Sequence, residues 1–180
     1  VNLQQYVSQL ESLKNNPYLS EVTRQQIADL LDRLKNLKAD EEISSDLLDE
    51  IQRVIDKAQE ELGLHVASQN IYLELYAGES AVTSAHVKNT LTSVSEITIE
   101  INGDAGNFVD FLKTSMILNP GEDSAFPVAV TIPSETAPGV YHGELVMSNE
   151  RGEIVVPVNI RVLEPQEKTL NLNLKALVDS

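Results

Sequence analysis

The sequence predicts an α+β protein of two domains, a helical unit over residues 1–66 and an antiparallel β-sandwich over residues 67–164. Before Gly63, apolar residues recur every three or four positions, as they do in amphipathic helices. After residue 67 they alternate with polar residues, which is typical of half-buried strands. Clusters of Gly, Pro and Asn separate these runs at a spacing that indicates a sandwich of about seven strands.

The helical unit is expected to contain a short first helix and an antiparallel hairpin of two longer ones. Thr23 and Gln26 predict a capping box at the start of the second helix. The third is predicted to begin after Ser44 and to end where Gly63 takes the left-handed conformation. Facing apolar residues predict a seam between the two longer helices, formed by Leu30, Leu34, Leu37, Ile51, Val54 and Ile55. Replacing Ile51 by Asp is then expected to melt the helices and leave the sandwich folded.

A helical unit of this size buries only a modest core by itself. We therefore expect its apolar faces to be covered further by the sandwich, by a second copy of the chain or by an upstream helix.

Turn motifs are expected to fix the register of the sandwich strands. Pro138 fixes φ for a turn and Gly139 permits a positive φ. Tyr141 then starts a strand, and a Tyr at such a corner can hydrogen-bond its hydroxyl back to the loop. Pro157, inside the last apolar run, cannot donate to a β-ladder and predicts a sheet edge or a bulge. The predicted structural turn residues are Pro120, Gly121, Pro138, Gly139, Tyr141 and Gly143.

Three sequence features together carry a resemblance to a known group. Asn89 precedes a polar turn, Pro120-Gly121-Glu122 precedes a long strand, and a Pro-Gly-x-Tyr-x-Gly element spans residues 138–143. Residues 68–164 resemble the immunoglobulin-like accessory domains of prokaryotic surface and secreted proteins, a group that includes the NEW3 domain and relatives of the ASH and PapD-like sandwiches. The resemblance implies an immunoglobulin-like sandwich and a bacterial or archaeal source. It does not extend to the helices, and it implies little about function because such sandwiches serve many tasks.

The end of the chain echoes the start of the predicted sandwich. Residues 70–77, NIYLELYA, and 169–176, TLNLNLKA, share the same alternation of apolar positions. Residues 165–180 are therefore interpreted as a linker followed by the first strand of a further sandwich. The alternative is an extra strand of the present one.

Charge and composition limit which classes of partner the chain can bind. The net charge is −15, so nucleic acid and anionic membranes would be repelled. The chain has no cysteine, which excludes disulfides and thiol chemistry. No apolar run is long enough to span a bilayer, so a membrane would be reached only through segments outside this chain. The chain begins with Val1 rather than Met, and we expect a processed form or a fragment of a longer protein.

A search for catalytic chemistry predicts no enzyme and no cofactor. The three histidines, His65, His86 and His142, lack the spacing that places two metal ligands on one face. His65 is expected in an interdomain linker, and the other two on strands facing solvent. The glycine-rich loop over residues 103–107 lacks the Lys of a phosphate-binding loop and is expected to be a hairpin connection. Calcium binding is left open, because no EF-hand loop is present.

The sequence therefore favours a non-catalytic structural or interaction segment of a multidomain cell-surface or secreted prokaryotic protein, acting as a spacer or a protein docking module. Expected partners are neighbouring domains, another protein, or a second copy through the helices. Two alternatives stay open: an accessory domain of a secreted hydrolase or protease, and a ligand-sensing ectodomain of a membrane receptor.

Overall fold

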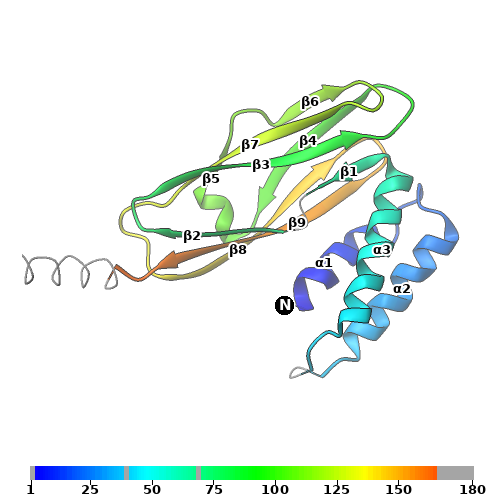
Figure 1. Ribbon diagram of the computed structural model, residues 1–180, viewed down its shortest axis with the longest axis horizontal. Helices are drawn as coiled ribbons and strands as arrows, with labels where there is room; N and C mark the ends of the chain where they lie inside the picture. Colours follow the sequence, from blue (N-terminus) through cyan, green and yellow to red (C-terminus); the bar gives the residue numbers. More distant parts are fainter. Residues whose placement is uncertain (1–2, 39–40, 68–69, 166–180) are drawn as a thin grey trace, which may run out of the picture.

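A computed structural model describes residues 3–38, 41–67 and 70–165 of the chain, and it contains a three-helix unit followed by a two-layer β-sandwich (Figure 1). The helices are α1 (Leu3–Leu13), α2 (Glu21–Lys35) and α3 (Ser45–Leu62). The strands are β1 (Leu64–Val66), β2 (Ile71–Tyr76), β3 (Ser80–Asn89), β4 (Ser95–Asn102), β5 (Val109–Phe111), β6 (Ser115–Leu118), β7 (Asp123–Thr131), β8 (Gly139–Ser148) and β9 (Glu153–Leu163). A short 3-10 helix, η1 (Asp104–Phe108), connects β4 to β5.

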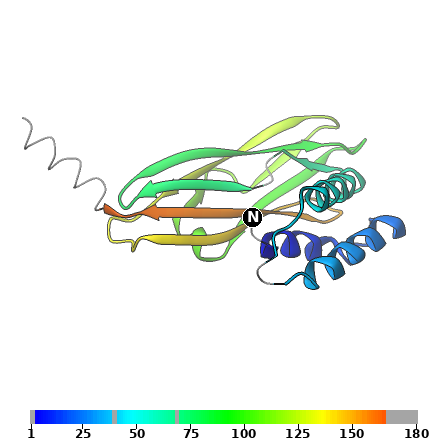
Figure 2. The same ribbon diagram turned by 60° about the horizontal axis from the view of Figure 1, so that its bottom comes forward.

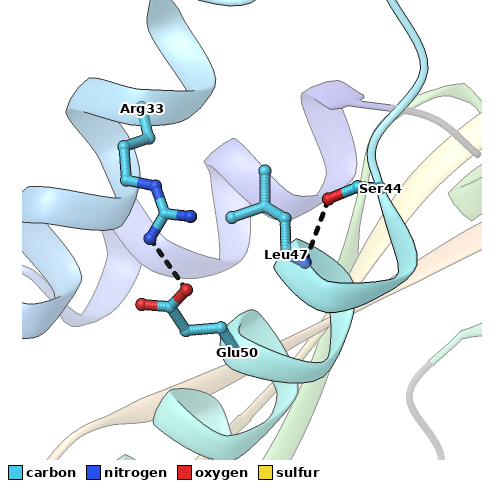
Figure 3. Close-up of polar contacts among 4 residues, drawn as sticks. All are labelled: Arg33, Ser44, Leu47 and Glu50. Carbon is cyan, nitrogen blue, oxygen red and sulfur yellow. Dashed lines mark hydrogen bonds and ion pairs between the residues drawn. The ribbon is translucent and has the colours of Figure 1, made fainter.

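Side-chain caps define where the helices begin. Ser44 accepts a hydrogen bond from the Leu47 N–H at 3.2 Å and caps α3, as the sequence predicts (Figure 3). The predicted start of α2 at Thr23 is wrong, because Ser20 takes the capping position three residues earlier and accepts from the Thr23 N–H. Thr23 is instead fully buried in the first turn of the helix. Gly63 ends α3 with φ of 74°, in the left-handed conformation that was expected.

The two sheets form an immunoglobulin-like sandwich. One sheet has the strand order β1-β3-β7-β5 and the other β2-β9-β8-β4-β6. All pairs are antiparallel except β2 with β9, which run parallel from Ile71 opposite Val158 to Tyr76 opposite Leu163. The described residues contain nine strands, more than the seven expected, because short segments such as β1 and β5 carry weak sequence patterns. The glycine-rich loop is a crossover between the sheets through η1, so its prediction as a hairpin connection is wrong.

The helices and the sandwich share one hydrophobic core. A connected cluster of buried apolar side chains includes Leu30 of α2, Ile51 of α3, and Ile154 and Val156 of β9. The sandwich therefore covers apolar faces of the helices, which is one of the three possibilities expected from the sequence. The chain passes from α3 into β1 through Gly63 alone, and β1 pairs with β3 in the sandwich. The first strand of the sandwich thus lies within residues 1–66.

Helix α1 covers part of a sheet edge. In both views it lies alongside the first half of β9 (Figures 1 and 2), which pairs with β8 on one side and has no strand on the other, because β2 pairs only from Val158 onward. The Gln9 side-chain amide donates to the Val155 carbonyl at 3.2 Å. Pro157 lies two residues after Val155, so its backbone nitrogen points the same way, away from β8. Its missing N–H therefore costs no hydrogen bond to β8. β9 is an inner strand between β2 and β8, so Pro157 is not in the edge strand that the sequence predicts; it is accommodated because its nitrogen faces away from β8, just before the pairing with β2 begins.

Candidate functional site

The seam between α2 and α3 is a packed apolar contact. Five of the six predicted residues have exposed fractions of 7% or less, namely Leu30, Leu34, Ile51, Val54 and Ile55. The sixth, Leu37, is partly buried against the same cluster. Leu10 and Leu13 of α1 are buried in that cluster too. Arg33 bridges the two helices by an ion pair with Glu50 at 2.8 Å (Figure 3), but both side chains are about half exposed, so the pair adds little stability.

The turn between β8 and β9 fastens the sandwich to the end of α3. Asn149 donates its side-chain amide to the Leu62 carbonyl at 2.9 Å, and the Arg151 guanidinium donates to the Glu61 carbonyl at 3.2 Å. The last carbonyls of a helix have no intrahelical donor, so these two side chains satisfy groups that would otherwise need water. The Asn16 amide, from the loop between α1 and α2, donates to the Arg151 carbonyl at 2.9 Å. We call these three hydrogen bonds the junction.

Close packing surrounds the junction. The Arg151 guanidinium lies 5.6 Å from the centre of the Tyr18 ring, a cation–π contact. A Cβ at Gly152 would overlap the Asn16 side-chain amide, so a larger residue in this turn would displace the amide that bonds to Arg151. The turn therefore contacts both the loop after α1 and the end of α3, which leaves little freedom for the helices to rotate on the sandwich.

Glu61 links the end of α3 to the start of α2. Its carboxylate accepts from the Ser20 N–H at 2.9 Å. Partial burial acts to raise the pKa of Glu61, but hydrogen bonds from the Thr23 and Ser20 side chains and from the Ser20 backbone outweigh it, and the pKa lies below its usual value. The carboxylate is thus ionised in the folded protein.

Asn89 organises the end of the sandwich beside the C-terminus of α3, where it stands opposite Leu64 of β1. Its side chain is fully buried and donates to the carbonyls of Ser93 at 2.9 Å and Leu118 at 3.0 Å. It also accepts from the Leu91 N–H at 3.0 Å. Its backbone carbonyl accepts from the Gly121 N–H at 2.8 Å, which joins the two turns at this end. The Asn that carried the family resemblance is thus a structural hub, and nothing in its contacts is arranged for a ligand.

The predicted turn residues have steric roles. Pro120 and Pro138 lie exposed in the turns before β7 and β8, followed by Gly121 and Gly139 with φ of 77° and 148°. A Cβ at Gly143 would stand 2.8 Å from the Asn102 carbonyl oxygen, so this glycine lets β8 approach the end of β4.

Tyr141 closes the corner that begins β8. Its hydroxyl donates to the Ala137 carbonyl at 2.7 Å, which is the return to the loop that the sequence predicts. Its ring meets Phe108 of η1 edge to face, with 4.9 Å between the centroids. Both contacts give Tyr141 a structural role.

The three histidines lie on three different strands. His65, His86 and His142 are exposed on β1, β3 and β8, and His65 lies in a strand rather than in the linker expected for it. Within the described ranges, no group of three or more His, Cys, Asp or Glu side chains could hold a metal ion. No helix among the described residues is long and apolar enough to cross a membrane.

A groove of about 350 Å³ separates α1 from the outer face of β8 and β9. Gly143, Pro157 and Val155 line it together with polar side chains. The polar lining residues are Gln4, Gln5, Ser8, Asn102, His142, Glu144 and Asn159. His142 and Asn159 contact each other through their side chains, so part of the polar lining is already hydrogen-bonded. The sequence did not predict this groove, because its two walls come from opposite ends of the chain.

Comparison with known proteins gives no match to any family model and no match among curated proteins. Solved structures match over about half of the chain. The ASH/PapD-like domain 7 of human CEP192 is 8% identical over 57% of this chain and 87% of its own, with a TM-score of 0.46. A protein from Porphyromonas gingivalis W83 is 18% identical over 56% of this chain and 48% of its own, with a TM-score of 0.48. The CupB2 chaperone of Pseudomonas aeruginosa is 10% identical over 54% and 55%, with a TM-score of 0.44. At these identities and scores, the matches say nothing about what this chain binds or does.

Proposed function

We propose that this chain is a non-catalytic structural and interaction segment of a multidomain cell-surface or secreted prokaryotic protein, related to the NEW3-type accessory sandwiches. Its helical unit and sandwich act together as one rigid spacer that also presents a docking surface. Its partners are neighbouring domains and another protein, and it reaches a membrane only through segments outside this chain.

The junction is the observation that carries this proposal. Domains joined by an exposed linker and a small polar contact are expected to move relative to each other. Here the carbonyls of Glu61 and Leu62, at the end of α3, accept hydrogen bonds from the turn between β8 and β9. The hydrophobic cluster also continues from the helices into the sandwich. An arrangement held by both packing and directional bonds favours a fixed geometry.

The direction of the strands supports a spacer. The helices lie at one end of the sandwich, and β9 runs away from them to its last residue, Leu163, at the opposite end (Figures 1 and 2). Whatever follows is held away from the helices by the length of the sandwich. The segment 166–180 lies outside the described residues. In β2, Ile71, Leu73 and Leu75 pack toward the core, and the sequence 169–176 repeats that alternation, which supports a following sandwich.

A distance measurement tests the rigidity. The chain has no native cysteine, so Cys introduced at Asp32 of α2 and at Glu135, both exposed, would take spin labels at those two positions only. We expect one narrow distance distribution between the labels. Asn149→Ala combined with Arg151→Ala should broaden it, because the junction loses its two donors to α3. A broad, multimodal distribution in the otherwise unchanged protein would contradict the spacer.

A further inference from the structure

Strand β6 is an edge strand with an uncharged, apolar surface. It pairs only with β4, from Ser95 opposite Leu118 to Thr98 opposite Ser115. Ile117 on its outer face is 70% exposed, and Leu112 in the loop before it is 83% exposed. Natural sheet edges are commonly protected by charge, proline or a bulge, and residues 114–119, TSMILN, contain no charge and no proline.

The backbone of β6 offers free hydrogen-bonding groups. The Ile99 N–H of β4 donates to the carbonyl of Thr114, the residue before β6, at 2.9 Å. Backbone groups alternate in direction along an edge strand, so the even-numbered residues Met116 and Leu118 also turn theirs toward β4. Ser115 and Ile117 are the odd-numbered residues between them. Their N–H and C=O groups therefore face away from the sheet, where a further strand could pair with them.

The other sheet edges among the described residues are less suited to pairing. The edge strands of the first sheet, β1 and β5, have three residues each. β2 is longer, but its Glu74 lies in the strand and forms an ion pair with Arg161 of β9 at 3.6 Å. The first half of β9 is covered by α1 through Gln9. β6 is thus the edge that combines free backbone groups with exposed aliphatic side chains.

The charges around β6 indicate what would bind. Glu96 stands opposite Ile117 on β4, and Glu100 lies further along the same exposed face. Lys113 is exposed in the loop before the strand rather than within it. Each copy carries a net charge of −15, and an edge of four residues is far smaller than a stable dimer interface needs, so a second copy is a poor occupant.

We propose that β6 is a docking edge that accepts an extended segment of a partner polypeptide carrying alternating aliphatic and basic residues. The partner strand would bond to the outward N–H and C=O groups of Ser115 and Ile117 and extend the five-stranded sheet by one strand. Its aliphatic side chains would cover Ile117 and Leu112, and its basic ones would lie near the carboxylates of Glu96 and Glu100. This inference rests on the proposed docking role and names its surface and the chemistry of its partner.

The test uses a synthetic peptide of alternating lysine and valine, seven residues long, titrated into the full chain labelled with ¹⁵N. We expect amide shifts centred on β6 and slowed hydrogen exchange at Ser115 and Ile117. The dissociation constant should be about 0.1 to 1 mM, because the surface is small. A peptide in which glutamate replaces each lysine should bind at least tenfold more weakly. Equal binding of the two peptides, or shifts centred on another edge, would overturn the proposal.

Two variants test the site itself. Ile117→Pro removes an outward N–H without removing a bond to β4, and it should weaken binding of the lysine peptide at least tenfold. Val82→Thr changes a valine that is 77% exposed on β3, in the other sheet, and should change binding less than twofold. Unchanged binding by the Ile117→Pro variant would contradict the proposal.

Analytical ultracentrifugation tests whether a second copy of the chain, rather than a partner segment, occupies the edge of β6. Concentration-dependent dimers that Ile117→Pro abolishes would assign the edge to a second copy and overturn the partner strand. Failure of the peptide to bind leaves the spin-label distances unaffected, so the docking edge and the rigid spacer fail independently.

Discussion

Replacing Asn89 by Ala tests how the turns at the helix end of the sandwich are held together. The substitution removes two donated hydrogen bonds, to the carbonyls of Ser93 and Leu118, and one accepted from the Leu91 N–H. A buried polar group left without a partner costs about 1 to 3 kcal/mol. The Leu118 carbonyl keeps its partner Ser95 in the ladder with β4, but each of the three lost hydrogen bonds contributes about 1 kcal/mol. We therefore expect the free energy of unfolding to fall by about 3 kcal/mol.

Urea denaturation followed by circular dichroism measures this loss. The midpoint should fall while the slope with urea stays constant, which indicates a change in stability rather than in the unfolded state. Asn15→Ala is the matched control, because Asn15 is exposed in the loop after α1, and it should change stability by less than about 0.5 kcal/mol. A loss below 0.5 kcal/mol for Asn89→Ala would refute the reasoning that this side chain holds two turns together.

Three further substitutions test other contacts. Gly143→Ala places a Cβ 2.8 Å from the Asn102 carbonyl oxygen and should cost about 1 to 3 kcal/mol in the same urea assay; a neutral effect would show that β8 can move away. Gln9→Ala leaves the Val155 carbonyl at the open part of β9 without its donor, and about 1 to 2 kcal/mol should be lost; an unchanged midpoint would mean that water replaces the amide. The folded-state pKa of Glu61 is lowered, so its stabilising contribution is fully present above the usual carboxyl value of 4.5 and is lost as the pH falls through the folded value. Glu61→Gln should therefore be less stable than the wild type at pH 7, with the difference disappearing as the pH falls below the lowered folded-state pKa; a difference that persists at still lower pH would assign the effect to packing.

Local signals explain which features the sequence could predict. Ser44 and Gly63 act within one turn of the helix that they bound, so their roles follow from neighbouring residues. Thr23 failed as a predicted cap because Ser20, three residues earlier, competes for the same role. The corner at Tyr141 is also local, since its hydroxyl bonds to a carbonyl four residues away.

Long-range contacts explain what the sequence could not predict. Gln9 and Val155 are 146 residues apart, and Arg151 and Glu61 are 90 apart. A turn such as Asn-Glu-Arg-Gly has the same composition whether it is free or bound to a helix, so the junction leaves no local pattern. For the same reason the sequence predicted that Ile51→Asp would melt only the helices. Ile51 belongs to the cluster that continues into β9, so the structure predicts that the sandwich is destabilised as well.

The shared hydrophobic cluster predicts that the helices and the sandwich fold as one cooperative body. Native-state hydrogen exchange of the unchanged protein tests this most directly, because it reports the free energy of opening for each element separately. The slowest amides of α3 and of β8 and β9 should exchange with the same opening free energy and respond equally to low urea. Amides of α3 that open at a free energy lower by more than about 2 kcal/mol than those of β8 and β9 would show that the helices unfold on their own and contradict the account.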